Sequence, residues 1–104
     1  MTTEARDTTD TTPPTTPGNF NGQSFQDGET WLSWDQSTDN VDPQSVIRYD
    51  VYVNSVFDQS LLGYGQTVVY GNGGVENTFQ VIAVDSAGNQ SAPASLTLCA
   101  ATFC

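Results

Sequence analysis

The segment Ile47-Arg48-Tyr49-Asp50-Val51-Tyr52-Val53 decides the fold class, because apolar residues alternate along it with polar or amphipathic ones. Side chains of a β-strand point to opposite faces in turn, so this period of two predicts a strand with one face in a core. The same alternation recurs in residues 30–34 and 79–84, and no segment has the period of a helix. The sequence therefore predicts an all-β protein.

Turn-forming residues separate these segments at the spacing of a β-sandwich. They include Asp27-Gly28, Asn72-Gly73-Gly74 and the run 85–89. We expect seven strands, near residues 19–25, 29–34, 46–54, 60–65, 67–71, 77–85 and 94–99. The side chains that alternate onto inner faces, and so should form the core, are Leu32, Trp34, Ile47, Tyr49, Val51, Val53, Phe79, Val81 and Ala83.

The first 17 residues differ from the rest of the chain in composition. They contain eight threonines and three prolines, and their only apolar side chains apart from proline are Met1 and Ala5, which cannot make a core. Proline favours extended backbone, so we expect an extended assembly arm or a linker that includes Thr11, Thr12, Pro13, Pro14 and Pro17. The predicted division is an arm or linker (1–17), a sandwich domain (18–99) and a C-terminal tail (100–104).

Charge and composition exclude several classes of function. The chain has twelve acidic residues against Arg6 and Arg48, and it contains no His and no Lys. Without these two residue types there is no imidazole base, no His-bearing zinc site, no Schiff base and no P-loop. A net charge of -10 is repelled by nucleic-acid phosphates and anionic lipids. We therefore expect no enzymatic activity, no cofactor, and neither a nucleic-acid nor a membrane partner.

Four blocks of sequence resemble bacterial-type fibronectin type III domains, in that family's order and spacing. They are DTTPPTTPGNF (10–20), LSWD with STDNV (32–41), YDVYVN (49–54) and AVDSAGNQS (83–91). The resemblance covers about residues 10–99 and implies a seven-stranded fibronectin type III or immunoglobulin-like sandwich of three strands against four. It also implies that Trp34 and Tyr49 form the aromatic centre of the core. Asn77 stands where this family usually has the tyrosine of the tyrosine corner, so we expect that latch to be absent.

Two aromatic side chains are candidate binding residues. Because Leu32 and Trp34 point inward, Trp31 must point outward, and Tyr52 does the same on the opposite sheet. An exposed indole can anchor a protein interface or stack on a sugar. Cover by a neighbouring side chain or by the N-terminal arm is the alternative for Trp31, and single exposed aromatics such as Tyr52 are ordinary.

Acidic residues give weak candidates for a calcium site. Asp35, Asp39 and Asp85 lie in two loops that share one pole in this fold, and Ca²⁺ takes oxygen ligands. Asp side chains also bond their own backbone in tight turns, which accounts for the same residues, so we predict no metal site.

The two cysteines, Cys99 and Cys104, suit neither a redox CxxC motif nor a metal knuckle. A local disulfide is the expected use, with two free thiols as the alternative.

These observations indicate a non-catalytic structural or display module. The start at Met1 and the lack of a signal peptide favour a virion surface protein of a bacteriophage capsid or tail, bound to other subunits through its arm or a sheet face. The Thr/Pro segment favours the alternative, an extracellular spacer or accessory domain beside neighbouring domains of a secreted carbohydrate-active enzyme or adhesin. A weak binding module for cell-surface carbohydrate is the third interpretation.

Overall fold

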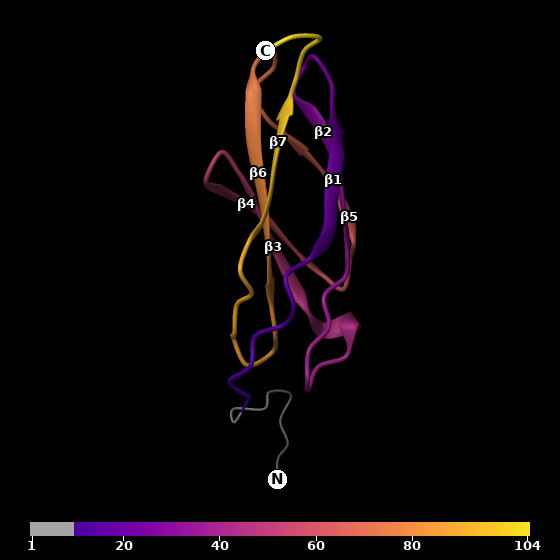
Figure 1. Ribbon diagram of the computed structural model, residues 1–104, viewed down its shortest axis with the longest axis vertical. Coiled ribbons are helices and arrows are strands. Elements are labelled where there is room, and N and C mark those ends of the chain that lie inside the picture. Colours follow the sequence, from indigo (N-terminus) through magenta and orange to yellow (C-terminus); the bar gives the residue numbers. More distant parts are fainter. Residues whose placement is uncertain (1–9) are drawn as a thin grey trace.

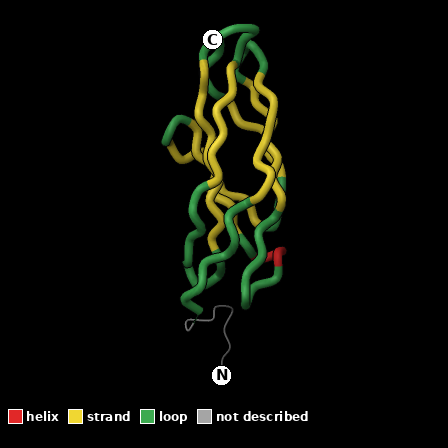
Figure 2. Tube along the Cα trace, in the orientation of Figure 1, coloured by secondary structure: helices red, strands yellow, loops and turns green. Residues whose placement is uncertain are grey.

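The computed structural model describes residues 10–104 as a sandwich of two antiparallel sheets (Figures 1 and 2). One sheet has the strand order β1 (Gly18–Ser24), β2 (Glu29–Asp35) and β5 (Gln66–Tyr70). The other has the order β4 (Val56–Leu62), β3 (Arg48–Val53), β6 (Glu76–Val84) and β7 (Ala94–Cys99). A single 3-10 turn, η1 (Gln44–Val46), precedes β3. The predicted all-β class and the division into three and four strands are confirmed.

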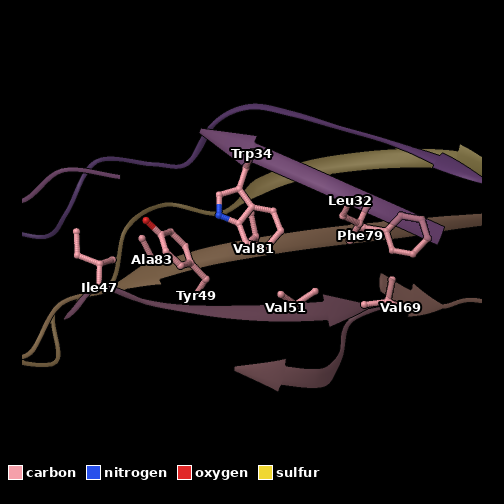
Figure 3. Close-up of a cluster of buried hydrophobic side chains, with 9 residues drawn as sticks. All are labelled: Leu32, Trp34, Ile47, Tyr49, Val51, Val69, Phe79, Val81 and Ala83. Carbon is pink, nitrogen blue, oxygen red and sulfur yellow. The ribbon is translucent and has the colours of Figure 1, made fainter. Parts of the chain in front are cut away.

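The core fills the space between the sheets, as Figure 3 shows. Trp34 and Tyr49 lie at its centre, with ring centroids 5.6 Å apart. Their polar atoms are satisfied, because Trp34 Nε1 donates to the carbonyl of Tyr64 and the Tyr49 hydroxyl accepts from the Ser37 N–H. The predicted core is correct except that Val53, at the end of β3, is half-buried, whereas Val69 of β5 is buried.

The fourth strand begins four residues earlier than the alternation predicts. Asn54 and Ser55 both have positive φ, at 51° and 70°, and make a two-residue turn that pairs Val53 with Val56. A glycine usually marks such a turn, and its absence hid this one from sequence reasoning. The strand ends at Leu62, and Gly63, with a φ of 70°, takes the chain out of the sheet.

Three segments meet at one end of the sandwich, which we call the loop pole: residues 10–17, the loop 36–47 and the loop 85–93 (Figure 1). The Thr15 N–H donates to the carbonyl of Thr38, and the Thr38 N–H donates back to the Thr15 hydroxyl, each at 2.9 Å. Asn89 Nδ2 donates to the carbonyl of Asp10, also at 2.9 Å.

The described part of the predicted arm contacts the domain itself. Asp10, Pro14 and Pro17 are buried, while Thr11, Thr12 and Pro13 are exposed. Hydrogen bonds with the domain's own loops hold this segment, and its role as an assembly arm or linker stays a prediction. Residues 1–9 of the predicted arm lie outside the described residues.

The opposite pole holds the C-terminal tail and the loop before β6. Cys99 and Cys104 form a disulfide. Ala100 is buried, and its backbone pairs with the N–H of Gly74 and the carbonyl of Val75. No helix among residues 10–104 is long and apolar enough to cross a membrane.

Asn77 stands in place of the tyrosine of the tyrosine corner and forms a link of a different kind. This side chain is fully buried, accepts from the Asn72 N–H at 2.9 Å, and donates to the carbonyls of Asn72 and Val75. A carboxamide carries both donors and acceptors, so one side chain bonds both kinds of backbone group in this loop.

Candidate functional site

An aromatic surface covers part of the outer face of the three-stranded sheet. Strand pairing places Gln23 beside Trp31 and Trp31 beside Val68, and it places Glu29 beside Tyr70. Paired residues of antiparallel strands project from the same face. We call this surface the Trp31 face, and it comprises Gln23, Phe25, Glu29, Trp31, Val68 and Tyr70.

The Trp31 ring is exposed but held in place. It is 56% exposed, so neither its neighbours nor residues 10–17 cover it. Phe25 meets it edge to face, with centroids 5.9 Å apart, and its Nε1 donates to Glu29 Oε2 at 2.7 Å. These contacts fix the ring while leaving apolar surface open to a ligand.

A shallow groove of about 500 Å³ adjoins the ring. It runs from β2 across β5 toward β4, and its lining is Trp31, Leu32, Leu61, Tyr64, Gln66, Thr67 and Val68. Gln59 of β4 bonds two of the lining residues: its side chain accepts from the Thr67 hydroxyl at 2.8 Å and donates to the Val68 carbonyl. Aromatic rings beside hydroxyl and amide groups can stack on a sugar ring and bond its hydroxyls.

Tyr52 lies on the opposite sheet, so the structure does not bring it together with Trp31. It is half-buried, and Phe57 packs edge to face on its ring at 5.8 Å. Phe57, which the sequence analysis did not single out, is the more exposed of the two. The pair lies where the pairing register of β3 and β4 shifts, between Val51 and Tyr52 of β3.

The acidic candidates separate into two places. Asp35 is exposed at the end of β2 and accepts from Asn19 Nδ2. Asp39 and Asp85 instead lie at the loop pole with Asp10, and one carboxylate oxygen from each falls within 4.8 Å of the others. Sequence reasoning missed Asp10 because it assigned that residue to the arm. The alternation already indicated that Asp35 points away, since it follows the inward Trp34.

Hydrogen bonds and burial act in opposite directions on two of these carboxylates. The Thr12 N–H lowers the pKa of Asp10, but burial and the neighbouring Asp85 and Asp39 outweigh it and raise the pKa of that carboxyl. Burial raises the pKa of Asp85, and donors from Asn89 and Ala87 outweigh burial and lower it. The three carboxylates thus lie close together, and the backbone N–H donors offset the repulsion between their negative charges only in part.

No protein-family model matches the chain. Chitinase A1 of Niallia circulans is 37% identical over 83 residues, which are 80% of this chain and 11% of that protein. Chitinase Chi52 of Paenibacillus xylanexedens is 39% identical over 85 residues, which are 82% of this chain and 16% of that protein. The chain therefore spans a small part of the length of these relatives.

The central fibronectin-III array of RIM-binding protein superposes on this structure with a TM-score of 0.66. The match covers 86% of this chain and 36% of that one, at 16% identity. The fold is a fibronectin type III/immunoglobulin-like β-sandwich. The fold implied by the four sequence blocks is thereby confirmed.

Proposed function

We propose that this sandwich is a non-catalytic accessory domain of an extracellular carbohydrate-active protein, and that it contacts polysaccharide through the Trp31 face. Two chitinases match most of this chain over a small part of their own length, which supports an accessory role beside other domains. These relatives favour the accessory-domain interpretation over that of a virion surface protein.

The single observation that carries the polysaccharide contact is the fixed, exposed ring of Trp31. Phe25 and Glu29 hold the indole before any ligand arrives, so little side-chain freedom is lost on binding. The C–H face of a pyranose ring is apolar and flat, and an indole face matches it. Tyr64, Gln66 and Gln23 provide polar groups around the ring for sugar hydroxyls.

Charge selects a neutral polysaccharide. The chain has a net charge of -10, so an anionic glycan would be repelled. None of the seven residues that line the groove is acidic. Glycoside hydrolysis ordinarily needs two carboxyl groups on either side of the scissile bond, and this lining favours binding without cleavage.

The test is sedimentation of the 104-residue chain with insoluble chitin and with cellulose. Trp31→Ala removes the stacking ring, and we expect the affinity to fall about 2- to 10-fold for a single aromatic contact. Tyr52→Ala, on the other sheet, is the matched aromatic control and should bind like the parent. Thermal unfolding of each variant would show that the fold is retained.

Three results would overturn this proposal. The first is equal binding by the parent and Trp31→Ala, and the second is a parent that binds neither polymer. The third is release of soluble sugars by the pure chain, which would show that the domain is catalytic.

A further inference from the structure

The loop pole brings three carboxylates together from distant parts of the chain. Asp10 precedes β1, Asp39 lies in the loop after β2, and Asp85 follows β6. One oxygen from each lies within 4.8 Å of the other two. Asp10 is 8% exposed and Asp85 is 4% exposed, and Asp39 is half-buried, so two of the three carboxylates are largely removed from solvent.

Positive charge is missing from the neighbourhood. Among residues 10–104 the one basic side chain is Arg48, and it pairs with Asp50 at 2.9 Å. Buried charges in proteins are normally paired or bind a metal ion. No basic side chain in the described part of the chain pairs with Asp10, Asp39 or Asp85, and the hydrogen bond between Asp10 and Asp85 brings no positive charge.

Backbone donors orient the carboxylates and leave one oxygen without a partner. Asp39 Oδ2 accepts from the N–H groups of Val41 and Asp42, each at 3.0 Å. Asp39 Oδ1 is buried and accepts no hydrogen bond. Buried acceptors are nearly always satisfied, so this oxygen indicates a ligand at the cluster.

We propose that Asp10, Asp39 and Asp85 hold a Ca²⁺ ion. Oxygens on opposite sides of a bound Ca²⁺ ion are about 4.6–5.2 Å apart, and the cluster's oxygens, all within 4.8 Å of one another, fit around such an ion. Mg²⁺ demands a near-ideal octahedron and usually keeps several waters, so a cage of three carboxylates suits Ca²⁺ better. Water completes the six to eight ligands that Ca²⁺ takes.

The ion would clamp the N-terminal segment to the sandwich. At present Asn89 and Thr38 hold residues 10–17 through a few hydrogen bonds. A calcium ion bound by Asp10, Asp39 and Asp85 would link the N-terminal segment to both loops. This calcium-dependent link would fix the direction in which the chain enters the domain. This inference does not depend on the Trp31 face.

The experiment measures thermal unfolding of the 104-residue chain in EDTA and then in 10 mM CaCl₂ at matched ionic strength. Calcium sites of extracellular modules have dissociation constants of about 10⁻⁴–10⁻³ M, so we expect the Tm to rise by about 5–20 °C. Asp10→Asn and Asp39→Asn should each abolish most of that rise. Calorimetric titration with CaCl₂ should give one site in the parent and none in these variants.

Two comparisons make the result decisive. Asp35→Asn changes an acidic residue outside the cluster and should keep the full response to calcium. In EDTA, Asp10→Asn should unfold at the parent's temperature or above it, because the amide oxygen still accepts from the Thr12 N–H while a negative charge beside Asp39 and Asp85 is removed.

A parent without a calcium-dependent Tm would overturn the proposal, and so would equal Tm rises in the parent and in both cluster variants. A lower Tm for Asp10→Asn in EDTA, with an unchanged response to calcium, would show that Asp10 acts only through hydrogen bonds. That outcome would also overturn the proposal.

Discussion

Asn54 Nδ2 donates a 2.9 Å hydrogen bond to Asn77 Oδ1 and so joins the β3–β4 turn to the start of β6. The Thr78 N–H donates to Asn54 Oδ1 at the same distance. Asn77 also bonds Asn72 and Val75, so one buried carboxamide connects the turn, the loop 71–75 and a central strand.

The first prediction concerns this carboxamide. Asn77→Ala removes the buried carboxamide together with its hydrogen bonds to Asn54, Asn72 and Val75, and we expect a loss of about 2–4 kcal/mol in the free energy of unfolding. Urea denaturation would measure it. Asn72→Ala keeps the backbone groups that Asn77 bonds and should cost far less; equal losses in the two variants would contradict the prediction.

The second prediction concerns the turn itself. Ser55 has a φ of 70°, a conformation that glycine adopts without the steric cost a serine bears. Ser55→Gly should therefore stabilise the domain by about 1 kcal/mol, which raises the Tm by about 4–8 °C. Asn54→Gly relieves the same strain but loses the bonds to Asn77 and Thr78, so it should give no gain. A Tm for Ser55→Gly at or below the parent's would show that the turn is unstrained.

The third prediction is a pH dependence. Burial raises the pKa of Tyr49 above the ordinary phenol value of 10.0, and the Ser37 hydrogen bond offsets this only in part. The unfolded chain therefore loses this proton at lower pH than the folded one. Its contribution to stability is complete below pH 10 and is lost as the pH rises through the folded pKa.

Urea denaturation between pH 8 and 11.5 would measure this decline. Tyr49→Phe should lower stability at neutral pH, since the Ser37 N–H loses its acceptor. Its stability should then fall less steeply above pH 10. Parallel declines in the parent and the variant would mean that other groups cause the alkaline loss.

The fourth prediction concerns the Cys99–Cys104 disulfide. It closes a ring of only six residues, so the loop-entropy estimate gives about 2 kcal/mol. We expect the double variant Cys99→Ala/Cys104→Ala to remain folded with a loss of that size or less, because Ala100 stays paired with Gly74 and Val75. Thermal unfolding with and without reductant would test this. Unfolding on reduction at room temperature would contradict it.

Strand alternation predicted most of the fold because burial on one face leaves a period of two in the sequence. Trp34, Tyr49 and Phe79 were placed in the core on that basis and lie there. The fourth strand was misplaced because its turn uses Asn54 and Ser55 in a conformation that glycine more often marks. Local sequence does not show strain that pairing between distant strands imposes.

The candidate sites were harder to predict, because they depend on where loops meet. Trp31 could be placed outward from its own strand alone. The Asp10–Asp39–Asp85 cluster joins residues 75 positions apart, and the composition of the first 17 residues gave no sign that Asp10 packs on the domain. The contact of Phe25 with the indole could not be read from the strand of Trp31 alone, because Phe25 follows the neighbouring strand β1.

The described chain enters the sandwich at the loop pole and leaves at the opposite pole (Figure 1). A pull on its two ends is therefore directed along the strands, and it loads many interstrand hydrogen bonds at once in shear. At the entry, the bonds from Asn89 to Asp10 and between Thr15 and Thr38 bear tension before β1 does. Under such a force we expect residues 10–17 to detach first. Their detachment lengthens the chain while the two sheets stay packed on each other.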